Sequence, residues 1–291
     1  MTGRTLFLPP RTTPTGTALA AAAARRGMRV RTLHDRRVPE EHQGDRGATL
    51  HAGPGFADLV APELGLGLLE ADEGRLAAQP YQLTCRRVEL MPVARARQLR
   101  VPAFMKPPND KSFPARVYTD GSRLPGPDAV DDDVPVLVSD IVTFTAEFRL
   151  FMLDGEVVTG SRYAVRGVRG VQGVQGVRDV VPLESDPRGA DVRDFAGRLF
   201  AAGLPALPSA VVVDVGTVDG RDNEGPPQER WAVVEANAAW AGGHDACDAD
   251  RALDVVLGAA RAVTAPDDVP FLRPRPSVRR STPRTHGKTG R

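Results

Sequence analysis

The chain has 291 residues, of which 41% are hydrophobic and 26% charged, a composition typical of a globular protein with a sizeable core. No apolar run is long enough to span a bilayer, and the apolar segment near the N-terminus is too short for a signal peptide. We therefore expect a cytoplasmic protein with no membrane contact. The two cysteines, Cys85 and Cys247, imply no disulfide framework.

The formal charge of +1 is unevenly distributed along the chain. Residues 272–291 hold seven Lys or Arg and no acid, so the rest of the chain carries −6. A net acidic body argues against nucleic acid as the main partner. Because the C-terminal segment has several prolines and no periodic apolar residues, we expect residues 269–291 to form a disordered basic tail.

The N-terminal part alternates strand and helix. Thr5–Leu8 predicts a strand, Thr15–Arg26 an alanine-rich helix that Gly27 would end, and Met28–Leu33 a second strand. Such short connections indicate an open parallel α/β sheet. The Gly-x-Gly-x-x-Gly pattern of dinucleotide-binding domains is missing from this segment. We expect this domain to end near residue 80.

The pattern changes after residue 100. Glu147–Leu153 and Glu156–Ala164 flank Asp154-Gly155, a strong signal for a β-hairpin. The Gly-Val repeats of residues 167–178 are too few for a solenoid and predict a mobile loop. The other predicted elements are strands at 101–106, 115–118, 134–138, 210–218 and 231–236 and helices at 192–203 and 249–263.

Two acids stand at the ends of apolar strands, in Val211-Val-Val-Asp214 and Trp231-Ala-Val-Val-Glu235-Ala-Asn237. A carboxylate there must meet a cation, because an unpaired buried charge is costly. Glu235 and Asn237 lie on one face of a strand, and this all-oxygen set suits Mg²⁺. The alternative is that both acids pair with nearby arginines, and the spacing does not decide between the two.

Three further groups are candidates for phosphate chemistry. Lys106 emerges from an apolar strand, where a phosphate is a natural partner. Glu147 and Arg149 share a strand face, and Arg162 lies across the hairpin. A structural salt bridge among these three is the favoured interpretation from the residues alone. Two arginines near a metal would instead suit a polyphosphate or an acyl phosphate.

Taken in order, these segments resemble the ATP-grasp superfamily and are similar to its branch containing the ribosomal-protein glutamate ligases. The resemblance covers about residues 100–263 and rests on the strand 135–142, the hairpin 147–162, the glycine-rich loop, Val213-Asp214 and Val233–Asn237. It implies an α/β protein with an ATP-grasp fold. An N-terminal open parallel α/β domain (1–80) would precede two α+β lobes (81–135 and 136–268) that clamp the nucleotide.

The resemblance also implies roles for individual residues in binding ATP. Lys106 matches a lysine that reaches the ATP phosphates. The glycine-rich loop that usually follows it is replaced by residues 107–114, where Lys111 could compensate. Glu147 is expected among the nucleotide-binding residues. The hinge strand, whose backbone would contact adenine, is matched by Val136, Leu137, Val138 and Ser139.

For catalysis, Arg149 and Arg162 match arginines that attend the transferred phosphate and the acyl phosphate. Asp214, Glu235 and Asn237 match the ligands of two Mg²⁺ ions. The segment after Asn237 departs from the family pattern. Trp240 and His244 in it could line an acceptor pocket, or could be a packed tryptophan and a surface histidine.

The resemblance implies an ATP- and Mg²⁺-dependent carboxylate–amine ligase. It would form an amide or peptide bond between a small-molecule or peptide carboxylate and an amine, through an acyl phosphate. Three alternatives remain open at this point: a kinase of the same fold that phosphorylates a hydroxyl, a degenerate nucleotide-binding protein, and an unrelated α/β binding protein whose acids are structural.

Overall fold

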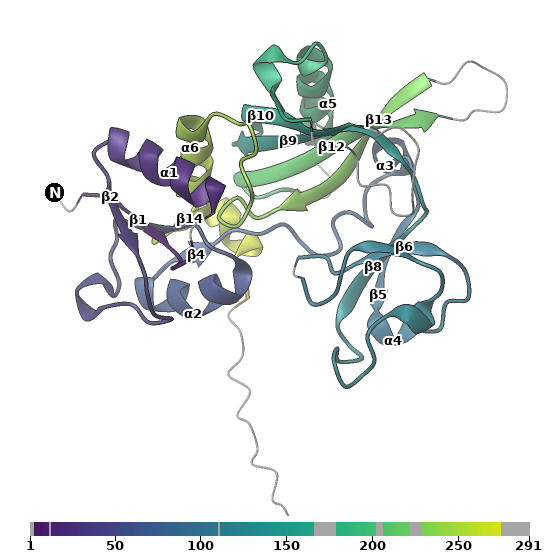
Figure 1. Cartoon of the computed structure of the whole chain (residues 1–291), viewed down its shortest axis with the longest axis horizontal. Coiled ribbons are helices and arrows are strands. Elements are labelled where there is room, and N and C mark those ends of the chain that lie inside the picture. Colours follow the sequence, from purple (N-terminus) through teal and green to yellow (C-terminus); the bar gives the residue numbers. More distant parts are fainter. Residues whose placement is uncertain are drawn as a thin grey trace, which may run out of the picture.

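A computed structural model describes residues 3–11, 13–109, 111–165, 179–201, 206–220 and 228–274. The Gly-Val run and the basic segment from residue 275 onward lie outside the described residues. Figure 1 shows three bodies: an N-terminal domain, a first lobe built on β5–β8, and a second lobe built on the long strands β9, β10, β12 and β13. Within the described residues, no helix is long and apolar enough to cross a membrane.

The N-terminal domain is the predicted open parallel sheet, with strand order β2-β1-β3. Helix α1 begins where Thr13 Oγ1 accepts a hydrogen bond from Gly16 N at 3.0 Å, and Pro14 occupies its first turn. Gly27, at φ 69°, follows its C-terminus as predicted. The elements are β1 (Thr5–Leu8), α1 (Pro14–Arg25), β2 (Arg29–Thr32), η1 (Glu40–His42), β3 (Ala48–Leu50) and α2 (Pro54–Leu64).

The first lobe is an antiparallel sheet of order β5-β8-β6-β7. One face packs into a core that includes Met91, Met105 and Val136. The opposite face carries Lys106 and the apolar side chains beside it, and it points toward the second lobe, since Leu137 joins that lobe's core. The elements are α3 (Tyr81–Thr84), β5 (Val88–Pro92), α4 (Val93–Ala96), β6 (Ala103–Lys106), β7 (Arg116–Tyr118), η2 (Gly121–Arg123) and β8 (Pro135–Ser139).

The second lobe is a twisted antiparallel sheet of order β11-β10-β9-β12-β13. The predicted hairpin is confirmed: Asp154 and Gly155 both have positive φ, at 49° and 87°. Helix α5 covers one face through Val192, Phe195 and Leu199, and α6 covers part of the other. The elements are β9 (Phe144–Leu153), β10 (Glu156–Val165), β11 (Val181–Pro182), η3 (Leu183–Ser185), α5 (Gly189–Ala201), β12 (Ala210–Gly220) and β13 (Gln228–Asn237).

The C-terminal elements join the second lobe to the N-terminal domain. The predicted helix 249–263 is too long, because α6 (Ala249–Ala259) ends where β14 (Ala260–Arg261) pairs with β4 (Gly67–Leu68). After η4 (Pro266–Phe271), Arg273 forms ion pairs with Asp58 and Glu70 at 2.7 and 2.6 Å. The folded chain thus continues to residue 274, past the predicted start of the tail at residue 269.

Candidate active site

The three predicted metal ligands meet on one face of the second-lobe sheet. Asp214 on β12 and Glu235 on β13 are directly opposite in the antiparallel register, so their side chains share a face. Asn237 lies two residues further along β13. Its Nδ2 donates to Asp214 Oδ2 at 3.2 Å and to Glu235 Oε1 at 2.9 Å.

A β-bulge shapes β13 directly before Glu235. The register passes from Asp214 opposite Glu235 to Val215 opposite Val233, so Val234 is the extra residue. The guanidinium of buried Arg86 donates to the carbonyl of Val234 at 2.9 Å and to that of Val233 at 2.8 Å. Arg86 therefore supports the backbone that presents Glu235.

Arg149 lies opposite Asp214 on the neighbouring strand β9 and binds it with a bidentate contact. Its Nε and Nη2 donate to the two Asp214 oxygens at 2.9 and 2.7 Å, and its Nη1 reaches Asp245 Oδ2 at 3.2 Å. Asp214 is only 1% exposed, so its charge depends on this partner. The pairing of a strand-end acid with an arginine, left open by the sequence, is therefore present in the same cluster.

Burial affects the carboxyl groups of the cluster in opposite ways. Burial raises the pKa of Asp214 to about 6, although Arg149 opposes the shift. Burial also raises the pKa of Glu147, which the hydrogen bond from Tyr163 at 2.8 Å only partly offsets. For Glu235 burial acts upward too, but Lys106 and Asn237 outweigh it and hold the pKa below its ordinary value. At neutral pH the cluster thus keeps ionised carboxylates beside its cations.

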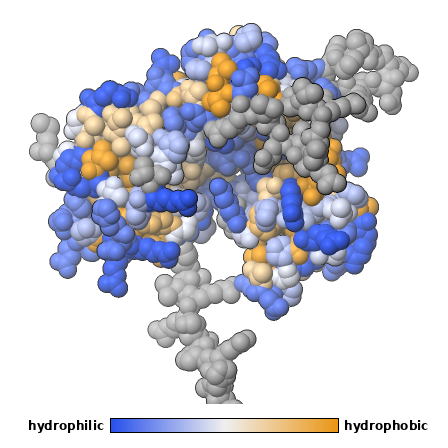
Figure 2. Space-filling view, in the orientation of Figure 1, coloured by the Kyte–Doolittle hydropathy of each residue, from blue (hydrophilic) through white to orange (hydrophobic). Residues whose placement is uncertain are grey.

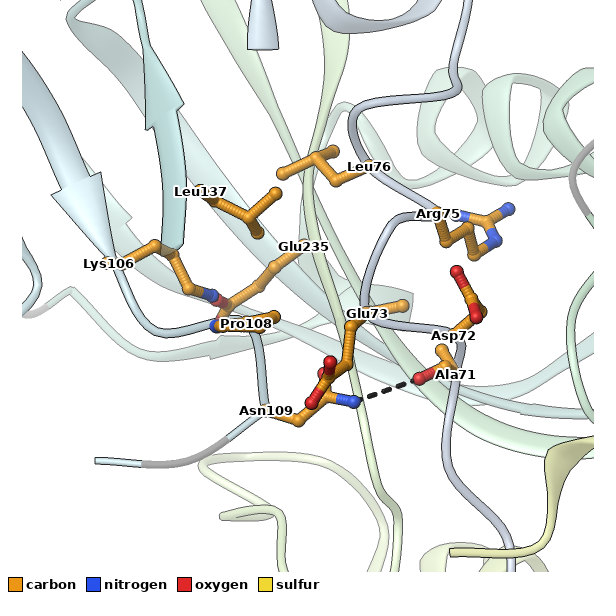
Figure 3. A pocket seen from close by; sticks show the side chains of 11 residues that line it. Ala71, Asp72, Glu73, Arg75, Leu76, Lys106, Pro108, Asn109, Leu137 and Glu235 are labelled. Carbon is orange, nitrogen blue, oxygen red and sulfur yellow. Dashed lines mark hydrogen bonds and ion pairs between the residues drawn. The ribbon is translucent and has the colours of Figure 1, made fainter. Parts of the chain in front are cut away.

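Lys106 reaches this cluster from the other lobe. Its Nζ forms an ion pair with Glu235 Oε2, and Figure 3 shows the two side chains meeting at one side of a pocket. The face of the first-lobe sheet that carries Lys106 also presents Phe104 and Val117, which are opposite each other in the register. Val117 is 47% exposed, so this apolar surface is open to a ligand between the lobes.

The space between these bodies is visible from outside. In the space-filling view, the molecule is hollowed between the N-terminal domain and the first lobe, and hydrophilic residues predominate in the recess (Figure 2). The pocket of Figure 3 lies between the lobes and is lined from three segments: the linker of residues 71–76, the first-lobe residues Lys106, Pro108, Asn109 and Leu137, and the second-lobe residues Glu235 and Ala236.

The predicted adenine-binding role of Val136–Ser139 is not supported by the position of this strand. As β8 it lies between β5 and β6, and residues 137–139 are paired on both sides. A central strand spends its N–H and C=O groups on its neighbours. Val136 also points into the first-lobe core. The first backbone past the strand belongs to residues 140–143, which connect the two lobes.

Two predicted residues lie apart from the cluster. Arg162 is opposite Phe148, on the sheet face covered by α5, whereas Arg149 is on the other face. Arg162 pairs with Asp186 at 2.7 Å and with Asp179 at 2.8 Å. The two arginines therefore do not converge. Lys111 is exposed on the loop after β6 and does not line the pocket.

The donor set fits a Mg²⁺ ion. Among the described residues no group of three or more His, Cys, Asp or Glu side chains could hold a metal, but the predicted set consists of two carboxylates and one amide. Asn237 presents Nδ2 to both carboxylates, and the opposite orientation of the same amide would present its oxygen there. Asp214, Glu235 and Asn237 then offer only oxygen ligands, as Mg²⁺ requires.

Some residues of the site were not found from the sequence. Asp245 and Tyr163 bind Arg149 and Glu147, and only the i, i+1 neighbours His244 and Arg162 drew attention to their segments. Trp240 is fully buried and donates from Nε1 to Leu69 O at 2.8 Å, so it is a packed tryptophan. His244 is half-buried, and its backbone N donates to Thr15 Oγ1 at 3.1 Å, next to α1.

Several solved structures are similar to this chain. One is a RimK domain ATP-grasp protein from Sphaerobacter thermophilus (15% identity, 88% of this chain and 100% of that chain, TM-score 0.46). Others are the ATP-grasp ligase PsnB bound to a minimal precursor (15%, 88% and 99%, TM-score 0.46) and D-alanine–D-alanine ligase from Bacillus anthracis (11%, 88% and 97%, TM-score 0.45). No curated protein sequence matches the chain.

The family assignment itself comes from the sequence. A family model described as an ATP-grasp domain, the second family of its clade, matches residues 83–255, which is more than half of the chain. This match confirms the resemblance and the fold class inferred from the ordered segments, and it excludes an unrelated α/β binding protein. The chain belongs to this ATP-grasp domain family.

Proposed function

We propose that this protein is an ATP-dependent carboxylate–amine ligase that forms an amide or peptide bond through an acyl phosphate. One observation carries the proposal: Lys106 of the first lobe meets Asp214, Glu235 and Asn237 of the second lobe at the interface between the lobes. A cation on one lobe and a hard-oxygen cluster on the other is what a metal-bound polyphosphate needs.

In this proposal the first lobe holds the nucleotide. The base lies on the apolar surface of Phe104 and Val117, and the backbone of the connection 140–143 recognises its edge. Lys106 leaves Glu235 and turns to the phosphates. Asp214, Glu235 and Asn237 hold Mg²⁺, which neutralises charge on the β- and γ-phosphates when it is bound.

Arg149 is the proposed catalytic cation. Its Nη1 extends past Asp214 toward Gly243 and Asp245, on the side of the N-terminal domain. A guanidinium there can stabilise the carboxylate oxygens of the acceptor as they take up the phosphoryl group. The amine then attacks the acyl phosphate, the C–N bond forms, and phosphate leaves. Positioning and charge stabilisation suffice for both steps, so no side-chain nucleophile is needed.

The test is ADP release from ATP and Mg²⁺ in the presence of pooled carboxylates and amines, with Glu235→Gln compared to the wild type. Glu229→Gln is the matched control, because Glu229 is an exposed acid on the same strand. Release that needs both pools, and that is lost only in Glu235→Gln, supports the ligase. A phosphorylated hydroxyl product would instead identify a kinase. Tight Mg²⁺·ATP binding without any ADP release would identify a nucleotide-binding protein without turnover.

A further inference from the structure

The linker between the N-terminal domain and the first lobe forms one wall of the pocket in Figure 3. Asn109 Nδ2, from the loop after β6, donates to Ala71 O at 3.0 Å. Leu76 packs into the second-lobe core together with Leu137. The linker is thus attached to both lobes, and the side chains between residues 71 and 76 keep defined positions at the pocket.

Arg75, in the middle of this linker, is an ionised side chain buried without a counter-charge. It is only 3% exposed and lines the pocket. Its Nε has no hydrogen-bond partner, and both Nη atoms share the oxygen of the Gln79 amide, at 3.2 and 3.1 Å in the orientation that turns this oxygen toward them. No carboxylate of the described part of the chain lies within ion-pair distance of it.

The other buried arginines near the site are satisfied. Arg86 donates to three backbone carbonyls, those of Thr84, Val233 and Val234. Arg149 and Arg273 each hold carboxylates, which raise their pKa values. Burial alone acts on Arg75 and lowers its pKa to about 10, so the group remains charged at neutral pH. Among these four, only Arg75 has donors left over for a ligand.

A buried guanidinium with free donors is costly unless an anion completes its surroundings. Its fork of N–H groups matches the oxygens of a phosphate or a carboxylate. The same pocket contains Lys106, whose single charge is shared with Glu235. We propose that Arg75 and Lys106 form a two-cation subsite that binds an oxyanion of the substrates. This deepens the proposed function and rests on it for the identity of the bound molecule.

Two sources share this oxyanion chemistry: the phosphates of the nucleotide and the carboxylate of the acid substrate. Arg75→Gln removes the charge and keeps a partner for Gln79. Arg75→Lys keeps the charge and loses the fork. Arg273→Gln is the matched control, because it removes a buried arginine whose charge is already paired with Asp58 and Glu70.

The experiment measures the unfolding temperature of the full chain with inorganic pyrophosphate, with succinate and with no multivalent anion. It also measures the affinities for ADP and adenosine. Without anions, Arg75→Gln should unfold at the same temperature as wild type or higher, whereas Arg273→Gln unfolds lower. Pyrophosphate should stabilise wild type and Arg273→Gln but not Arg75→Gln, with Arg75→Lys between them.

The affinities identify the source of the oxyanion. If the nucleotide supplies it, Arg75→Gln weakens ADP about tenfold or more and leaves adenosine unchanged. If the acid substrate supplies it, succinate rather than pyrophosphate stabilises wild type and loses its effect in Arg75→Gln. Either result supports the subsite.

Two results overturn the subsite: equal stabilisation of Arg75→Gln and wild type by the anions, or no stabilisation of wild type by either anion. Failure of the proposed function looks different. In that case neither adenosine nor ADP binds wild type, while the anion measurements still decide whether Arg75 binds an oxyanion.

Discussion

Lys106 and Glu235 belong to different lobes and form an ion pair at the base of the pocket between them. The lysine occupies one oxygen of a carboxylate that is also a proposed metal ligand, so ammonium and metal compete for the same group. The ion pair therefore connects nucleotide binding, metal binding and the contact between the lobes.

This competition gives a prediction with opposite signs. Lys106→Met frees Glu235, so Mg²⁺ alone should bind several-fold more tightly than to wild type, because no cation has to be displaced. Mg²⁺·ADP should bind about tenfold more weakly, because the phosphate contact is lost. Titration calorimetry measures both affinities. Lys111→Met, a change on the exposed loop, should alter neither, and a change of the same sign in both affinities would contradict the competition.

Arg149 and Arg162 can be separated by metal rescue. Arg149→Met leaves Asp214 buried without its partner and should lower the free energy of unfolding by about 3–5 kcal/mol. Mg²⁺ should restore part of this loss, because a divalent cation can replace the counter-charge of Asp214. Arg162→Met creates the same problem at Asp186, whose side chain is fully buried, on the other sheet face.

Urea unfolding with and without Mg²⁺ checks the difference between these two variants. Mg²⁺ should not restore the stability of Arg162→Met, and this variant should retain its affinity for Mg²⁺·ADP. Rescue of both variants, or of Arg162→Met alone, would contradict the separation of the two arginines.

The pKa of Asp214 predicts how the stability of the metal-free protein depends on pH. Burial raises this pKa from its ordinary value of 3.8 to about 6, so the folded state holds the proton to a higher pH than the unfolded state. The stabilisation from this group is present below pH 3.8 and is lost as the pH rises to about 6. Asp214→Asn should remove this component. Urea unfolding in chelator across this pH range measures the difference, and a difference that does not vary with pH would refute the assignment.

The apolar face of the first lobe should determine affinity for the base. Phe104→Ala removes part of the surface opposite Val117 and should weaken adenosine and ADP by the same factor, about tenfold. The equal effect follows because the base is common to both ligands. Lys106→Met, on the same face, serves as the comparison: it should weaken ADP and leave adenosine unchanged. Unequal losses in Phe104→Ala would place the base elsewhere.

Local signals predicted most of the elements. The Asp154-Gly155 turn, the Gly27 helix terminus and the apolar strands around Asp214 and Glu235 depend on short-range backbone preferences, and the structure has them where they were predicted. The helix after residue 249 was overestimated, because pairing of Ala260 with Leu68 replaces its last turn, and that pairing joins residues far apart in the chain.

The sequence by itself determined the family and the meeting of Asp214, Glu235 and Asn237, because the i, i+2 spacing on one strand and the order of the segments are local properties. Only the tertiary structure decided where the arginines point. A bulge in the pairing of β10 and β9 and the packing of α5 place Arg162 against Asp186, and strand order encloses β8 between two neighbours. Burial decided the rest: Arg75 is an ordinary residue in a turn of the chain, and it becomes an unpaired charge only when two lobes and a linker exclude water around it.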